Sequence, residues 1–219
     1  VLSKEELGQI ADFAKANNLL VVSDEAYDRL LYDGLEHRSI ASEPGMRDRT
    51  VILGSFSKTY SMTGWRIGYV AAPANISKLI GNYLSHCISS PCSISQKAAA
   101  AALSGSQETV EAMRKAFEER RNYMVDRMNQ IEGVSCIQPH GAFYVMMNIE
   151  KLVGKELFGH VIQDSDDFGK LFLQYGKVAV VPGTSFGAPN FVRWSYATSI
   201  ENIKEGLDRL EKFLRGEAV

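Results

Sequence analysis

Three short apolar runs in the first third of the chain end abruptly in polar residues. They cover residues 19–22, 50–54 and 67–72, and the first two are followed at once by the polar segments 23–25 and 55–58. Continuous apolar runs of this length are typical of strands buried on both faces, as in a parallel sheet covered by helices. Because ligands bind at the carboxyl edge of such sheets, these polar segments are the first indication of a functional site.

Apolar residues at helical spacing predict helices around these runs. Ser3 and Glu6 form an S-x-x-E capping box, so a helix is expected to begin there and to end near residues 17–18. An alanine-rich helix is expected over residues 93–105, and a long helix over about residues 106–131. The runs and helices together predict an α/β fold with a mostly parallel sheet in the first part of the chain.

After residue 133 the pattern changes to that of an α+β domain. One helix is expected to be capped by Ser165, and a final helix by a capping box of Thr198 and Glu201. Residues 153–164, which contain glycines, are expected to form a loop. Apolar or alternating segments predict three strands, over residues 141–147, 178–181 and 192–196.

Composition and charge exclude several classes of function. The 219 residues carry 24 basic and 26 acidic side chains, a formal net charge of −2, so there is no basic field for binding nucleic acid. The longest purely apolar stretch, residues 98–103, is too short to span a bilayer, and we expect no signal peptide. We therefore expect a cytoplasmic protein that binds neither nucleic acid nor membrane.

The three cysteines, Cys87, Cys92 and Cys136, have irregular spacing. They form no C-x-x-C pair, and the four histidines show no spacing typical of metal ligands. The sequence therefore predicts neither a metal site nor a disulfide framework, and the cysteines are expected to be buried, reduced thiols.

One cluster of polar residues follows the second apolar run. It contains Ser55, Ser57 and Lys58, with Arg66 eight residues after the lysine. Hydroxyl groups and a guanidinium can hold a phosphate. The lysine could be a further phosphate ligand or a nucleophile that forms a Schiff base, and the cluster alone leaves both possibilities open.

A carboxylate at the end of the neighbouring run narrows the chemistry. Asp24 needs a cationic partner if it is buried, and a protonated pyridine nitrogen would be such a partner. Tyr27, three residues later, could donate to a phenolic oxygen. An imine-forming lysine, a phosphate grip and a carboxylate for a ring nitrogen are together what pyridoxal 5'-phosphate requires.

The same residues resemble a known family. Residues 23–27 (S-D-E-A-Y) and 55–69 (S-F-S-K-T-Y-S-M-T-G-W-R-I-G-Y) are similar to motifs of the class I/II aminotransferases of fold type I, which depend on pyridoxal phosphate. Residues 191–199 resemble the carboxylate-binding motif of that family, and residues 141–144 and 181–183 resemble further landmarks. The matches follow the family's order along the whole chain.

The resemblance implies a role for each residue of the cofactor site. Lys58 would hold the cofactor through an imine and then carry a proton between substrate and cofactor. Asp24 would pair with the ring nitrogen, and Tyr27 would hydrogen-bond the 3'-oxygen. The phosphate would be held by Ser55, Ser57 and Arg66.

Two residues of the later part would contact the substrate. By itself Arg193, on a predicted strand opposite an aromatic face, is most simply a surface ion pair. The motif around it implies instead that it binds the α-carboxylate of the substrate in a bidentate manner. The resemblance also implies that Phe143 lines the substrate pocket.

The resemblance covers only the later part of the family's chain. Family members normally carry a further N-terminal segment with a phosphate-binding helix start, a ring that stacks on the pyridine, and an N-P-x-G motif. Residues 1–105 therefore resemble the second half of the large cofactor domain, and residues 106–219 the linking helix and the small domain. A sheet without its remaining strands exposes an edge and an apolar face, so we expect a homodimer or association with an N-terminal segment.

Three functions remain open at this stage. The first is transfer of an amino group between an L-amino acid, of aspartate or aromatic type, and a 2-oxo acid. The second is a β-lyase on the same scaffold, which would use the same lysine, aspartate and arginine. The third is a non-catalytic fragment or dimerising effector module, because the N-terminal cofactor contacts are absent from this sequence.

Overall fold

The computed structural model describes residues 1–219, which form two compact units, Val1–Arg114 and Lys115–Val219. The boundary lies within the helix α5 (Glu108–Met128), whereas the sequence places it between residues 105 and 106. The sequence shows an interruption only at the turn before α5. A continuous helix can contribute its first turns to one unit and its later turns to the other, and no local pattern marks the residue where this change occurs. The assignment of the two parts to a cofactor domain and a small domain stays a prediction.

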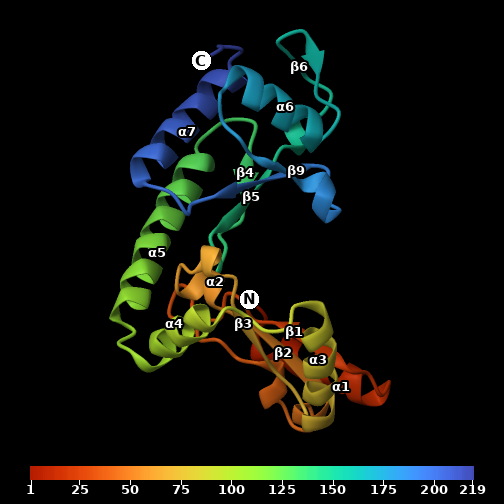
Figure 1. The fold of residues 1–219 in the computed structure, drawn as a ribbon. Helices are drawn as coiled ribbons and strands as arrows, with labels where there is room; N and C mark the ends of the chain where they lie inside the picture. Colours follow the sequence, from red (N-terminus) through yellow and green to blue (C-terminus); the bar gives the residue numbers. More distant parts are fainter. The chain divides into compact units, whose positions relative to one another are not determined.

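The first unit contains a sheet in the order β1-β2-β3 (Figure 1). Strands β1 (Val21–Asp24) and β2 (Thr50–Ser55) are parallel, as the sequence predicts. Strand β3 (Gly68–Ala71) runs antiparallel to β2, because the connection between them contains only single helical turns and cannot cross a face of the sheet. The sheet is therefore mixed rather than mostly parallel.

These strands are less buried than the sequence predicts. Thr50 and Val51 of β2 are buried, but β3 is exposed along its length and Val22 of β1 is 62% exposed. The expectation of strands buried on both faces is therefore wrong for β1 and β3. In β1 successive side chains point to opposite faces, and only Val21 packs against the core of this unit.

The helix α1 (Lys4–Ala16) begins with the predicted capping box. Ser3 Oγ accepts from Glu6 N at 3.2 Å, and Glu6 Oε2 accepts from Ser3 N at 2.7 Å. These bonds satisfy two backbone donors that a helix start otherwise leaves without acceptors. The buried face of α1 packs against Ile40 and Met46 and forms one core cluster of the unit.

The remaining helices of this unit differ in how well the sequence predicts them. The alanine-rich helix α4 (Ser93–Ser104) is confirmed. The sequence-based prediction omits the helix α3 (Ala74–Cys87), although Ile76, Leu79, Ile80, Tyr83 and Leu84 recur at helical spacing, and no residue of this helix is buried. The other helical elements are short: α2 (Phe56–Thr59) and the 3-10 turns η1 (Ile40–Ser42), η2 (Arg47–Arg49) and η3 (Thr63–Trp65).

The second unit is an α+β domain built on an antiparallel sheet in the order β4-β5-β9-β8. The helices α6 (Ser165–Tyr175) and α7 (Ile200–Leu214) belong to the same unit (Figure 1). Their side chains Phe172 and Phe213 pack on each other and, through Phe172, on Trp194. The strands are β4 (Ser135–Cys136), β5 (Tyr144–Asn148), β8 (Val181–Pro182) and β9 (Phe191–Ser195).

The expectation of a loop over residues 153–164 is wrong for residues 156–161, and the residues on either side are irregular as expected. The 3-10 turn η4 (Glu150–Leu152) is followed by a small hairpin of β6 (Glu156–Leu157) and β7 (His160–Val161). Phe158 and Gly159 both have positive φ, +53° and +77°, as a two-residue turn that follows the strand twist requires. The ring of Phe158 stacks on that of Tyr175, with 4.2 Å between the ring centres. No local sequence pattern predicts this contact.

Both predicted caps in this unit are shifted by one residue. The helix α6 is capped by Asp164, whose Oδ1 accepts from Asp166 N at 2.8 Å and from Asp167 N at 3.1 Å. Ser165 Oγ instead accepts from Thr184 N. The helix α7 is capped by Ser199 rather than Thr198, and Ser199 Oγ accepts from Asn202 N at 3.2 Å. Adjacent residues of similar capping preference compete, and tertiary contacts decide between them.

The cysteines are free, but not all of them are buried. Cys87 and Cys92 are exposed at the connection between α3 and α4, and only Cys136 is partly buried. Burial raises the pKa of the Cys136 thiol to about 11. No helix of the structure has both the length and the apolar character that crossing a membrane requires. No cluster of three or more His, Cys, Asp or Glu side chains is arranged to hold a metal ion.

Candidate active site

Five of the predicted site residues meet at one edge of the first unit's sheet. Asp24 ends β1 and Ser55 ends β2, and because these strands are parallel their carboxyl ends lie at the same edge. Ser57 and Lys58 follow in α2. The antiparallel strand β3 begins where β2 ends, with Gly68 opposite Ser55, so Arg66 also lies at this edge.

The single helical turn α2 holds the lysine. Ser55 caps it, and its Oγ accepts from Ser57 N at 3.2 Å. Phe56 is 4% exposed and anchors the turn in a cluster with Met62 and Ala99. Lys58 is therefore presented, half-buried, from a turn whose first residue is fixed in the core.

Arg66 has an unusual backbone conformation. Its φ is +50°, in the left-handed region that residues other than glycine seldom occupy. Its side chain is exposed, and Nη1 donates to Thr63 O at 2.9 Å. This bond uses one of the five guanidinium N–H donors and leaves a fork able to bind an anion.

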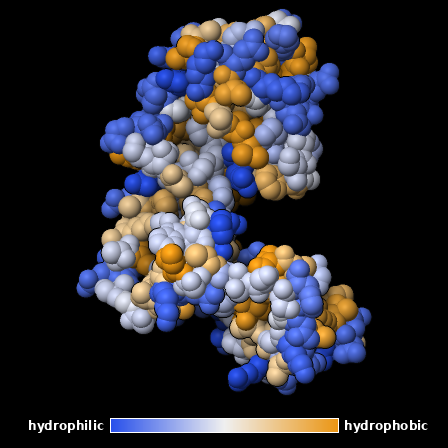
Figure 2. Space-filling model, in the orientation of Figure 1, coloured by the Kyte–Doolittle hydropathy of each residue, from blue (hydrophilic) through white to orange (hydrophobic).

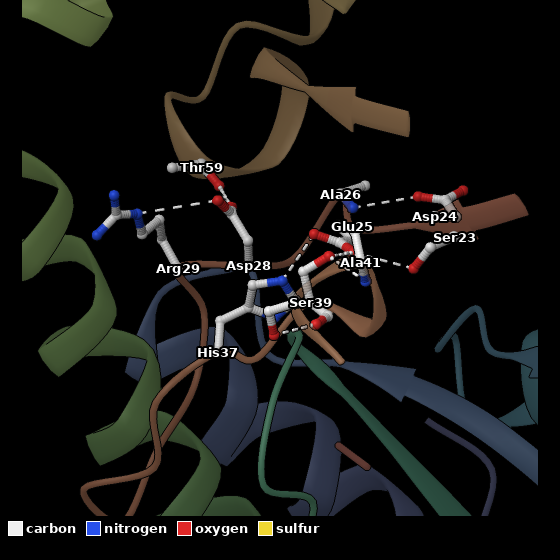
Figure 3. Close-up of polar contacts among 11 residues, drawn as sticks. Ser23, Asp24, Glu25, Ala26, Asp28, Arg29, His37, Ser39, Ala41 and Thr59 are labelled. Atoms are coloured by element: carbon white, nitrogen blue, oxygen red, sulfur yellow. Dashed lines mark hydrogen bonds and ion pairs between the residues drawn. The ribbon is translucent and has the colours of Figure 1, made fainter. Parts of the chain in front are cut away.

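Asp24 is exposed in this chain, so the expectation of a buried carboxylate is not met here. Its Oδ1 accepts from Ala26 N at 3.1 Å, which turns the chain immediately after β1 (Figure 3). Tyr27 lies in this turn and is half-buried. The exposure follows from the open faces of the short sheet described above.

The sequence does not predict the network that holds this turn. Glu25 Oε1 accepts from Ser23 Oγ at 3.0 Å and from Ser39 Oγ at 2.6 Å, and Glu25 Oε2 lies 2.8 Å from His37 Nε2 (Figure 3). Only 11% of the Glu25 side chain is exposed. No local signal could reveal the contacts with His37 and Ser39, because these residues lie 12 and 14 positions along the chain.

Removal of this shared acceptor should destabilise the first unit. We expect Glu25→Ala to lower the free energy of unfolding by about 1–3 kcal/mol, because three donors lose a poorly solvated partner. Urea unfolding measures the change. Glu36→Ala, at an exposed position of the same segment, is the matched control and should stay within about 0.5 kcal/mol of the wild type. Equal stabilities of the two variants would contradict the expectation.

A tyrosine of β3 lies over the glycine before Ser55. A Cβ atom on Gly54 would fall 2.1 Å from Tyr69 Cζ, so the ring occupies the space that a side chain would need. Partial desolvation of the Tyr69 phenol raises its pKa although the residue as a whole is exposed, and the negative charges of Asp28 and Glu25 raise it further. The phenol therefore stays protonated at neutral pH and can donate a hydrogen bond.

This close approach predicts the effect of a single methyl group. Gly54→Ala is expected to displace the Tyr69 ring and to lower the free energy of unfolding by about 1–3 kcal/mol, as overpacking does. Thermal unfolding measures the loss. Gly8→Ala in α1 is the control, because nothing lies within 4 Å of its Cβ position, and it should be neutral or slightly stabilising. A Gly54→Ala variant as stable as the wild type would show that the ring moves freely.

Arg193 belongs to the second unit, on β9. Its guanidinium carbon lies 4.3 Å from the ring centre of Tyr144 and 4.7 Å from that of Phe186. Val192 and Trp194 on either side are buried, which confirms the predicted alternation. Contact with two aromatic faces restrains the guanidinium and orients its fork of donors.

Phe143 lies in the core of the same unit. It is 9% exposed, and its ring centre is 5.6 Å from that of Phe117 and 4.6 Å from that of Tyr144. Tyr196 OH donates to Ala142 O at 3.2 Å and fixes the backbone before it. These contacts give Phe143 a packing role, and its role in lining a substrate pocket stays a prediction.

The groups at the carboxyl edge of this sheet are a lysine, a carboxylate, two hydroxyls and an arginine. This combination agrees with the match to a known family. The sequence pattern described as "Aminotransferase class I and II" matches residues 1–210. The chain belongs to this aminotransferase family.

Named relatives agree with this assignment. The chain is 43% identical over 219 residues to the aspartate aminotransferase of Geobacillus stearothermophilus, across 100% of this chain and 55% of that protein. It is 41% identical over 219 residues to aromatic-amino-acid aminotransferase 2 of Thermococcus litoralis, across 98% of this chain and 54% of that protein. The aspartate aminotransferase structure from Rhizobium meliloti matches with a TM-score of 0.94 at 35% identity, across 98% of this chain and 55% of that one.

The chain thus spans about half the length of the curated relatives that it matches. The predicted fold class, part of an α/β fold of type I together with an α+β domain, is confirmed by the matching structures. The predicted membership of an aminotransferase family is confirmed as well.

Proposed function

We propose that this chain supplies the lysine-bearing part of an aminotransferase that uses pyridoxal 5'-phosphate. The reaction would transfer an amino group between an L-amino acid and a 2-oxo acid. The observation that supports the proposal is the shared edge of β1 and β2, where Asp24 and Ser55 end their strands and Lys58 and Arg66 belong to the segment that connects β2 to β3. The names of the relatives support a substrate of aspartate or aromatic type.

The donors at this edge fit the phosphate of the cofactor. Ser55 Oγ accepts from Ser57 N and keeps its own proton to donate. Ser57 adds a second hydroxyl, and Arg66 keeps most of its guanidinium donors after the bond to Thr63. Hydroxyls combined with a guanidinium fork are suited to a phosphate dianion. These three residues would hold it.

The other groups at this edge fit the ring. When bound, pyridoxal phosphate supplies an electron sink that stabilises negative charge at the α-carbon of the substrate. Asp24 would hold a proton on the ring nitrogen through its carboxylate, and Tyr27 would donate to the 3'-oxygen. The Lys58 amine would bind the cofactor covalently and move a proton to or from the α-carbon.

Arg193 is the residue that would bind the carboxylate of the substrate. Its guanidinium is restrained between the rings of Tyr144 and Phe186, so little side-chain freedom is lost when it binds an anion. A planar fork matches the two oxygens of a carboxylate. This residue would bind the α-carboxylate of the amino acid in a bidentate manner.

We also propose that another polypeptide segment covers exposed apolar side chains of the first unit. Apolar side chains are exposed on the helices of this unit, and Figure 2 shows apolar patches on the molecular surface. A second copy of the chain, or an N-terminal segment such as the longer relatives possess, would cover this surface, within a cytoplasmic enzyme. The most exposed of these residues on the helices are Tyr83 (71%), Ile94 (70%), Leu79 (68%) and Phe13 (65%).

The test separates the three functions that the sequence leaves open. The protein is incubated with pyridoxal phosphate, freed of excess by gel filtration, and examined for imine absorbance. Addition of L-aspartate, followed by 2-oxoglutarate, should yield oxaloacetate and then L-glutamate. Pyruvate and ammonia from β-chloro-L-alanine, with no glutamate formed, would favour the β-lyase. A protein that retains no cofactor would favour the non-catalytic module.

A further inference from the structure

The turn after β1 is held at both of its ends. At its start, Glu25 binds Ser23, His37 and Ser39, as described above. At its end, Asp28 Oδ1 accepts a hydrogen bond from Thr59 Oγ1 at 3.0 Å (Figure 3). The second contact joins two segments 31 residues apart in the sequence, and the proposed function does not account for it.

The positions of Asp28 and Thr59 in the chain make this bond informative. Asp28 directly follows Tyr27, and Thr59 directly follows Lys58. Each pair of neighbours is separated by one peptide unit, about 3.8 Å between Cα atoms. A bond between Asp28 and Thr59 therefore restrains the distance between the backbones that carry Tyr27 and Lys58.

The helical turn α2 cannot hold its own orientation. It has four residues, and an isolated turn of this length is unstable because nucleation of a helix is unfavourable. Its first residue, Phe56, is anchored in the core. Thr59, its last residue, is 2% exposed, and its hydroxyl supplies the polar anchor at the other end.

The bond to Thr59 is also the stronger of the polar contacts that Asp28 makes. A hydroxyl that donates to a carboxylate is charge-assisted, and a β-branched threonine has few rotamers to lose. The ion pair with Arg29 spans 3.8 Å, and that arginine is 63% exposed, so it contributes little.

We propose that the Asp28–Thr59 hydrogen bond is a positioning contact that fixes Tyr27 and Lys58 relative to each other. Neither Asp28 nor Thr59 is a catalytic residue in this inference. The inference rests on the proposed function, because it assigns Tyr27 and Lys58 to one cofactor.

The test compares variants of Thr59 with a matched threonine. Thr59→Val keeps the shape and removes the hydroxyl, and Thr59→Ser restores it. Thr50→Val is the control, because Thr50 is also 2% exposed and its Oγ1 donates to Met46 O at 2.8 Å at the opposite end of β2. Asp28→Ala removes the acceptor at a less buried position. It is the alternative variant if Thr59→Val does not fold.

Two measurements are made on each variant. In titrations with pyridoxal phosphate, Thr59→Val should bind at least about tenfold more weakly than the wild type, with Thr59→Ser close to wild type. In the cofactor-free protein, Thr59→Val should accelerate amide hydrogen exchange in residues 25–29 and 55–60 together. Thr50→Val should lower thermal stability without either effect.

The outcomes separate this inference from the proposed function. A wild-type protein that binds no cofactor overturns the proposed function, and hydrogen exchange then decides whether the two segments are coupled. Unchanged exchange in Thr59→Val and Asp28→Ala overturns the positioning contact. Equal losses of cofactor affinity in Thr59→Val and Thr50→Val overturn it as well, because they would reflect stability alone.

Discussion

Replacement of Lys58 by alanine is expected to remove the imine absorbance that pyridoxal phosphate gives with the wild-type protein. The amine is the only group at the edge of β1 and β2 able to form this bond, among the five predicted residues there. Loss of its proton transfer should also lower the rate of amino-group transfer by about 10²–10⁴-fold or more. Absorbance spectra and single-turnover kinetics with L-aspartate measure the two effects.

The control for this variant is a lysine of the same unit outside the site. Lys78 is exposed on α3, and Lys78→Ala should keep both the absorbance and the rate of the wild type. Lys58→Arg keeps a positive charge but cannot form the imine, so it should behave like Lys58→Ala. Identical spectra for Lys58→Ala and the wild type would contradict the assignment of the lysine.

The second large effect is expected at Arg193. Arg193→Gln should lower kcat/KM for a dicarboxylic amino acid by about 100-fold or more, mainly by raising KM. A hydrogen bond to a charged group contributes about 1.5–3 kcal/mol, and each 1.4 kcal/mol corresponds to a factor of ten. The aromatic rings that enclose the guanidinium would remain in place, so the variant should stay folded.

Two further substitutions sharpen this prediction. Arg193→Lys keeps the charge but loses the planar fork, so it should recover only part of the lost kcat/KM. Arg215→Gln removes an exposed arginine at the end of α7 and should leave kinetics unchanged. An amino acid amide, which lacks the carboxylate, should not distinguish Arg193→Gln from the wild type, and a large difference there would argue against carboxylate binding.

Features that depend on neighbouring residues could be predicted from the sequence. The capping box of Ser3 and Glu6 and the helix α4 are as predicted, because the interactions that form them span at most a few residues. The strands β1, β2 and β9 also occur where apolar or alternating runs place them. The caps of α6 and α7 were each misplaced by one residue, because adjacent polar residues compete for the same backbone donors.

Features that depend on distant residues could not be predicted. The hairpin over residues 156–161 depends on the stacking of Phe158 on Tyr175, and β3 depends on pairing with β2 for its antiparallel direction. The partners of Glu25 and Asp28 in the site likewise come from other segments. Hydrophobic periodicity contains no information on such pairings.

The sequence by itself determined the chemical groups of the candidate site. It contains Lys58, Asp24 and Arg66 directly after or beside apolar runs, and the order of these motifs identifies the family. The tertiary structure alone decided that β3 runs antiparallel to β2, which brings Arg66 to the edge that carries the other two groups, and that Thr59 binds Asp28. The physical reason is that residue types follow from the chain locally, whereas register and buried hydrogen bonds follow from contacts across the fold.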